Sequence, residues 1–99
     1  MHRPPRMSKQ TDLLLRALFS APQTWRHGYD LSQETEIKSG TLYPLLMRLE
    51  EQGFLESRWE QPEREGRPPR HAYRLTAKGI TLAKELRKPA HRQFVMKPA

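Results

Sequence analysis

The feature that most constrains the fold is a stripe of leucines between Ser39 and Leu55. Its leucines recur at i, i+3, i+4 and i+7, which places them on one side of an α-helix. Gly53 follows as a helix stop, so the pattern predicts a helix over residues 39–52. The opposite side of this helix is slim at its amino-terminal end and could approach another surface closely. The stripe consists of Leu42, Leu45, Leu46 and Leu49.

Two starts are open for this helix. Either Ser39 or Thr41 can cap it, because a hydroxyl can accept a hydrogen bond from a first-turn amide. If Thr41 is the cap, the missing N–H of Pro44 falls in the first turn and costs nothing. If Ser39 is the cap, one hydrogen bond is lost early in the helix.

Size and composition limit the class of protein. A chain of 99 residues makes one domain, and a hydrophobic content of 35% predicts that a partner chain shares the burial. The absence of cysteine excludes disulfides and thiolate metal sites. No apolar run approaches the ~18 residues of a membrane span, and no apolar stretch precedes Leu13. We therefore expect a cytoplasmic protein with no membrane contact.

The charge is basic and unevenly placed. The net charge is +7, from 18 Lys and Arg against 11 Asp and Glu. The basic excess gathers in residues 1–11, 64–74 and 75–99, whereas residues 12–55 are slightly acidic. This placement suits a polyanion such as nucleic acid. A solvated surface that keeps a small protein soluble is an equally good interpretation of the charge alone.

Two further helices are expected before the leucine stripe. Apolar positions in residues 8–20 recur with helical spacing, and Ser8 or Thr11 can cap that helix. Residues 27–36 predict a second, short helix, with Tyr29 packed against the first. A tight connection then leads into residues 39–52, as a helix-turn-helix requires.

A β-hairpin and a last helix are expected after the stripe. Residues 54–60 and 70–75 alternate at period two, which indicates half-buried strands. In the first strand Leu55, Ser57 and Trp59 share a side, and in the second His71, Tyr73 and Leu75 oppose Arg70, Ala72 and Arg74. Between the strands lies a loop rich in Pro, Gly and Arg, whose basic tip projects into solvent. Thr76 caps the last helix, which Pro89 ends or kinks.

These elements define the expected domain organisation. Residues 8–88 form the folded domain, residues 1–7 a disordered basic arm and residues 89–99 a tail.

Catalytic chemistry is poorly supplied. No histidine has a second His at i+3 or i+4, and the one acid at such a spacing, Asp30 after His27, makes a pair and not a set of metal ligands. No serine lies in a nucleophile elbow, and no glycine-rich phosphate loop occurs. We therefore expect no enzyme, no cofactor and no metal site. The histidines are His2, His27, His71 and His91.

Nucleic-acid binding is better supplied. A helix that enters the major groove needs small residues at its leading end, and Ser39, Gly40 and Thr41 meet that need. An ordinary helix start with solvated charges explains each residue taken alone. The basic loop tips the balance toward groove binding, because its arginines could follow the backbone or enter a minor groove. Candidates around the helix are Lys38, Tyr43, Pro44 and Arg48, and those in the loop are Arg64, Arg67 and Arg70.

The order of elements and the residues themselves resemble the PadR family of bacterial transcription regulators. The resemblance covers residues 13–86 and depends mainly on two strings, residues 40–44 and 73–76, which are fairly specific only in combination. Further matches are His27-Gly28-Tyr29, Leu49-Glu50, Gly53-Phe54-Leu55, Arg70 and Gly79.

The resemblance implies a mostly α fold with a small β-hairpin, a winged helix-turn-helix of order α-α-α-β-β-α. It implies a homodimer, associated with the bacterial nucleoid, that binds a pseudo-palindromic double-stranded DNA operator, usually as a repressor. Helix 39–52 would read the major groove, and wing 61–70 would contact the backbone or minor groove. Ser39, Gly40, Thr41, Tyr43 and Pro44 match the recognition-helix motif, and Arg67 and Arg70 fall in the wing.

One departure concerns the dimer. The family usually has a long C-terminal helix or an added domain that builds it, whereas Pro89 leaves a helix of about three turns here. Some members bind flat aromatic ligands between subunits, but this last helix has no Trp, and no inducer is predicted.

Two alternatives keep the same fold. The first is a protein-interaction module, an adaptor or anti-repressor without its own operator, for which the acidic positions leave room. The second is an RNA-binding winged helix. The acidic positions are Glu50, Glu51, Glu63 and Glu65.

Overall fold

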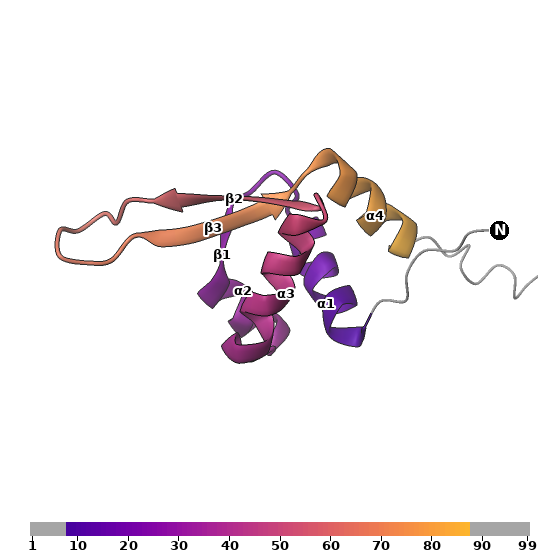
Figure 1. Ribbon diagram of the computed structural model, residues 1–99, viewed down its shortest axis with the longest axis horizontal. Coiled ribbons are helices and arrows are strands. Elements are labelled where there is room, and N and C mark those ends of the chain that lie inside the picture. The colour runs from indigo at the N-terminus through magenta and orange to yellow at the C-terminus, as the bar shows by residue number, and fades with distance from the viewer. Residues whose placement is uncertain (1–7, 88–99) are drawn as a thin grey trace, which may run out of the picture.

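A computed structural model describes residues 8–87 of the chain, so the expectations for residues 1–7 and for Pro89 onward lie outside it. The helices gather at one end of a long β-hairpin, whose other end extends far beyond them (Figure 1). This arrangement confirms the winged helix fold and adds one short strand that the sequence did not indicate. The elements are α1 (Lys9–Phe19), β1 (Arg26–His27), α2 (Gly28–Thr35), α3 (Ser39–Glu51), β2 (Leu55–Glu60), β3 (Arg70–Leu75) and α4 (Ala77–Arg87).

Helix α1 is the centre of the core. Ser8 caps it, since its Oγ accepts a hydrogen bond from the Thr11 amide at 3.0 Å. Its inward leucines pack against α2, the sheet and α4. The leucine stripe of α3 belongs to the same core, as predicted. Removing these side chains from water is the main source of stability for a domain of this size. Residues with at most 1% exposure include Leu14, Leu15, Leu18, Leu31, Leu42 and Leu46.

The turn between α2 and α3 is tight, as expected, and is held by side chains. Glu36 adopts a left-handed conformation with φ of 64°, which ends α2. Ser32 Oγ donates to the Ile37 carbonyl at 2.6 Å, and Thr35 Oγ1 accepts from the Ile37 amide at 3.2 Å. These bonds satisfy backbone groups that would otherwise have no helical partner.

The start of α3 differs from both expectations. Lys38 is the N-cap through its backbone, and neither Ser39 nor Thr41 caps the helix with its side chain. The Lys38 carbonyl accepts the Thr41 amide at 2.9 Å and the Leu42 amide at 2.8 Å. Pro44 therefore lies inside the helix, where its missing N–H costs one hydrogen bond.

The sheet has three antiparallel strands in the order β1-β3-β2. The expected strands are present as β2 and β3, but β1 pairs Arg26 with Tyr73 and His27 with Ala72. β3 is therefore central, and Ala72 and Tyr73 are both buried, at 0% and 2% exposure. Strict alternation across β3 was wrong on this point, because β1 pairs alongside β3 and places His27 directly opposite Ala72.

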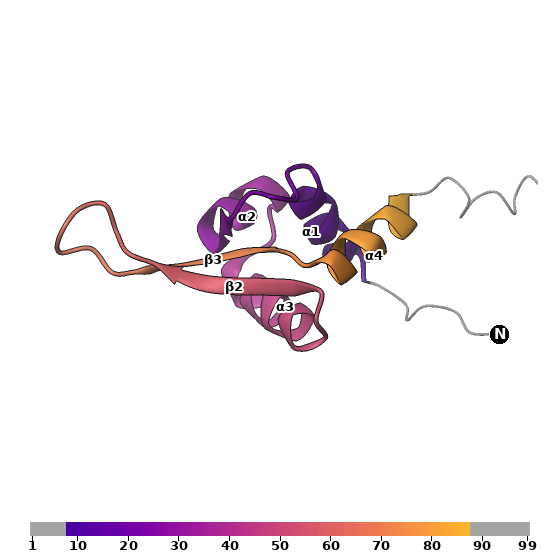
Figure 2. The ribbon, with the colours of Figure 1, turned by 90° about the horizontal axis from the view of Figure 1, so that it is seen from above.

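Helix α4 returns the chain to α1, and the two lie side by side (Figure 2). Thr76 caps α4 as predicted: its Oγ1 accepts from the Gly79 amide at 3.0 Å and donates to the Gly53 carbonyl at 2.6 Å. Gly79 is buried against the Phe54 backbone. Within residues 8–87, no helix has the length and apolar character to cross a membrane.

Candidate nucleic-acid interface

The amino-terminal half of α3 has a free face. Ser39, Gly40, Thr41 and Pro44 are exposed there, and a Cβ added to Gly40 would meet nothing within 4 Å. The N-cap residue Lys38 is also exposed. The Thr41 amide donates to the Lys38 carbonyl, but no side chain caps the Ser39 and Gly40 amides, so these two are available to an outside acceptor such as a phosphate.

Tyr43 is placed differently from the other residues of this face. Its ring lies against the backbone of Gly28, so closely that a Cβ on Gly28 would be 2.2 Å from the phenol oxygen. The side chain is 38% exposed. We therefore find Tyr43 lying against the start of α2, with only part of its ring open to a ligand.

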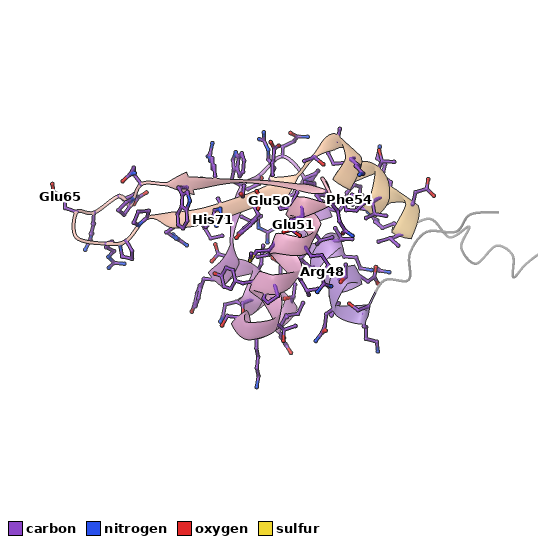
Figure 3. All side chains as sticks on the ribbon, viewed as in Figure 1. Arg48, Glu50, Glu51, Phe54, Glu65 and His71 are labelled. Carbon is purple, nitrogen blue, oxygen red and sulfur yellow. The ribbon has the colours of Figure 1, made fainter. Side chains whose placement is uncertain are left out.

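Arg48 lies two turns or more from the leading end of α3, about 13 Å along the axis from Ser39. It is exposed, and in Figure 3 it appears on the side of α3 away from the wing loop. The structure thus separates Arg48 from the other candidates by most of the length of the helix.

The wing carries its arginines outward. Arg64 and Arg67 are exposed in the loop between β2 and β3, and Glu65 lies at the tip (Figure 3). The loop turns at Gly66, whose φ of 88° is favourable only for glycine. Arg70 begins β3 with a half-exposed side chain, 4.0 Å from the Asp30 carboxylate of α2. Arg70 is therefore the wing arginine nearest to the helices.

His27 fastens the base of the wing to α2. Its Nε2 lies 2.8 Å from Glu60 Oε1 at the end of β2, and its Nδ1 lies 3.5 Å from Asp30. The hydrogen bond from His27, followed by that from Arg58, holds the pKa of Glu60 below its ordinary value of 4.5. We predicted no binding role for His27 and placed it at the start of the second helix, whereas it belongs to β1 and precedes α2.

The opposite face of the sheet is occupied by structural contacts. The Trp25 ring lies between the guanidinium groups of Arg58 and Arg74, at 4.2 and 4.4 Å from its centroid. Arg74 also pairs with Glu56 at 2.9 Å. These arginines are engaged within the fold, so they contribute less to an external anion than the loop arginines do. Trp25 covers the fold here, in line with the lid-like role that loop tryptophans usually have.

Tyr29 does not pack against the first helix and is 66% exposed. The buried residues of α2 are Gly28 and Leu31, and the 100° step of a helix turns Tyr29 almost opposite to Leu31. The prediction that it contacts α1 was therefore wrong. Tyr29 instead borders a groove between the helices and the wing, described below.

The groove is lined mainly by aromatic side chains that sequence reasoning did not bring together. It has a volume of about 440 Å³. The Trp59 and His71 rings stack across β2 and β3 with centroids 4.3 Å apart and planes 7° apart. Only the strand register shows that they face each other. The lining residues are His27, Gly28, Tyr29, Tyr43, Trp59, Pro69, Arg70 and His71.

The arrangement suits binding far better than catalysis. Tyr43 of α3 and Arg70 of the wing border one groove, and a helix beside a hairpin is the combination that fits a duplex. Within residues 8–87, no group of three His, Asp or Glu side chains is placed to hold a metal ion.

The fold and this surface define a winged helix-turn-helix protein. Within that class, the chain belongs to the PadR-like family of transcriptional regulators, whose family model matches residues 18–85. A comparison with curated proteins found no match.

Solved structures agree with this assignment. The chain is similar to a PadR-like transcription factor from Bacteroides fragilis, with 29% identity over 86% of this chain and 81% of that chain and a TM-score of 0.68. A PadR family transcription regulator from Clostridium difficile R20291 is 23% identical over 88% and 91% of the chains, with a TM-score of 0.66. The fold alone is shared with a MepR mutant from Staphylococcus aureus, at 19% identity over 94% of this chain and 66% of that chain, with a TM-score of 0.73.

Proposed function

We propose that this chain is a sequence-specific regulator that binds double-stranded DNA and acts as a repressor. Helix α3 reads the major groove with its amino-terminal half, and residues 61–70 of the wing contact the backbone or an adjacent minor groove. The observation that carries this proposal is the shared groove, in which Tyr43 of α3 and Arg70 of the wing border one concave surface. One duplex can therefore meet both elements.

Each part of this surface has its own task in the proposal. The uncapped amides at the start of α3, with the Ser39 and Thr41 hydroxyls, bind phosphate oxygens and reach base edges. Arg64 and Arg67 extend along the backbone or into the minor groove, where narrow width concentrates negative potential. Lys38 adds charge at the leading end of α3, and Arg48 is the candidate for a bidentate contact with guanine.

We further infer that two copies bind an inverted-repeat operator as a homodimer. Leu13 on the outer side of α1 is 43% exposed, and Phe19, Leu82 and Leu86 are only partly buried on α1 and α4. A second copy that covers this α1–α4 surface would remove apolar area from water. To enter successive major grooves, the two α3 helices of such a dimer must lie about 34 Å apart, one turn of DNA.

The test selects bound fragments from random duplex DNA and then measures affinity for the selected site across salt concentrations. We expect an inverted repeat and a steep, linear fall of log K with log salt. Arg67→Ala should weaken binding to all duplexes and lower the slope by about 1, whereas Thr41→Ala should mainly weaken binding to the selected site. Lys84→Ala, an exposed lysine on α4, is the matched control for loss of one positive charge.

Several outcomes would contradict the proposal. If no sequence is enriched over random duplex, the proposed sequence specificity is wrong. If affinity does not depend on salt, the proposed phosphate contacts are wrong. Preference for RNA in competition would favour the RNA-binding alternative. Retention of a protein partner by the Thr41 and Arg67 variants, with no DNA binding by the parent chain, would favour the adaptor. A monomeric mass by light scattering, with and without DNA, would overturn the homodimer.

A further inference from the structure

An exposed tryptophan lies at the inner corner between the wing and the helices. Trp59 is 66% exposed, yet its ring is held in one orientation by the stack on His71. His71 is held in turn by Tyr73, whose tilted ring has its centroid 4.7 Å from that of His71 and whose hydroxyl lies 3.0 Å from His71 Nδ1. An indole exposed to this degree leaves apolar area in water, and the face of the ring away from His71 is open to a ligand.

The indole N–H of Trp59 is also unsatisfied by the protein. Within residues 8–87 it makes no hydrogen bond, so this exposed donor is available to an outside acceptor. The corner around it is positive at one edge, where Arg70 lines the same groove. The site therefore offers a flat apolar face, one free donor and a nearby guanidinium, which together match a sugar–phosphate unit.

The geometry of a duplex brings such a unit to this place. A sugar–phosphate strand always separates a major groove from the adjacent minor groove. If α3 occupies the major groove and the wing loop meets the minor groove, that strand passes between them. The groove bordered by Tyr43 on one side and Trp59 on the other is the space between these two elements.

We propose that Trp59 is a DNA-backbone contact, with its ring face on a deoxyribose and its Nε1–H donated to a phosphate oxygen of the strand that crosses the groove. The inference rests on the proposed DNA binding. It adds a neutral contact to a wing whose other proposed DNA contacts are arginines. His71 acts as a positioning residue, because its stacked ring holds the indole at the angle that meets the strand. The contact reads no base, so it supplies affinity without sequence preference.

The experiment compares wild type with Trp59→Phe and Trp59→Ala in two measurements, affinity across salt concentrations and tryptophan emission. The probes are a selected duplex and a duplex of mixed sequence. We expect Trp59→Ala to weaken binding to both duplexes by about the same factor, roughly tenfold. Because the residue is neutral, the salt slope should stay at the wild-type value, unlike the fall of about 1 for Arg70→Ala. Trp59→Phe keeps the ring contact but loses the N–H, so its affinity for duplex should lie between those of wild type and Trp59→Ala.

Emission provides a second, direct readout. The chain has two tryptophans, and Trp25 is enclosed by Arg58 and Arg74 on the other face of the sheet. The change in emission on adding duplex should therefore be present in wild type and absent in Trp59→Phe. Trp25→Phe, which removes the other tryptophan on the far face of the sheet, is the matched control and should keep both the emission change and the wild-type affinity.

Each outcome separates this inference from the proposed function. Wild-type affinity in Trp59→Ala, with no emission change on binding, would overturn the contact and leave DNA binding intact. A drop in salt slope with Trp59→Ala would also overturn it, since the effect would then come from a displaced charge. Failure of the wild-type chain to bind any duplex would overturn the proposed function itself.

Discussion

The phenol of Tyr43 in α3 rests on the backbone of Gly28 at the start of α2, where a single added methyl group would be 2.2 Å from the phenol oxygen. The contact joins the two helices of the helix-turn-helix at their outer edge. It also fixes one wall of the groove that leads to the wing.

Gly28→Ala should therefore have opposite effects in two backgrounds. With Tyr43 present, the new Cβ displaces the phenol, and the gain from alanine is offset or reversed. In a Tyr43→Ala background the space is free, and the same change should stabilise by about 0.4–1 kcal/mol. Urea unfolding of the four variants measures this coupling. Additive effects would contradict the contact.

Gly79→Ala should be more damaging, because the obstacle is backbone. A Cβ on Gly79 would lie 2.0 Å from the Phe54 carbonyl oxygen, which cannot swing away as a side chain can. We expect a loss of about 2–3 kcal/mol, despite the better helix propensity of alanine. The matched control is Gly40→Ala, an exposed helix position with open space around the new Cβ, which should stabilise by up to about 1 kcal/mol. Equal stability of the two variants in chemical denaturation would refute the close approach.

Pro44→Ala should stabilise α3. It restores an N–H that can bond to the Gly40 carbonyl, and Pro44 is exposed, so little packing is lost. Alanine also gives the unfolded chain more conformational entropy, which offsets part of this gain. We therefore expect the free energy of unfolding to rise by about 1–2 kcal/mol. Pro68→Ala in the wing loop removes a proline outside any helix and should change stability little. The measurement is the shift of the urea midpoint, and a Pro44 variant no more stable than the Pro68 variant would contradict the prediction.

Tyr73 should make the domain sensitive to alkali. Burial, with smaller contributions from Tyr43 and Glu50, raises the pKa of Tyr73 to about 12. A raised pKa in the folded state gives stability that is complete below the unfolded value of about 10 and is lost as the pH rises from there toward 12. Absorbance of the phenolate should show a late-titrating tyrosine that Tyr73→Phe removes. The variant should also lose less stability than wild type over this pH range.

The long periodic segments were readable from the sequence, and the short strand was not. The leucine stripe of α3 spans more than two turns, so its face and its burial followed directly from spacing. β1 contains only Arg26 and His27, too few residues to show any period. Its absence from the prediction explains why Ala72 was placed on an exposed side, since burial on the second face of β3 depends on what covers it.

The candidate interface was predictable in outline but not in its inner corner. Small residues at a helix start and arginines in a proline-rich loop are local signals, and the structure places them on exposed surfaces. Trp59 and His71 become neighbours only through the register of β2 on β3, which the long loop between them does not specify. The α3 cap was missed for a similar reason, because Lys38 acts there through its backbone geometry.

The two-residue strand β1 is followed directly by α2, and both of its residues pair with β3. The paired part of the hairpin is therefore fixed to the helix-turn-helix through β1, whereas residues 61–69 extend beyond β1 (Figure 2). Chimeras that exchange only these tip residues should keep the angle between stem and helices. Under the proposed function, such an exchange changes the contacts of the wing with flanking DNA and leaves the rest of the domain as it is.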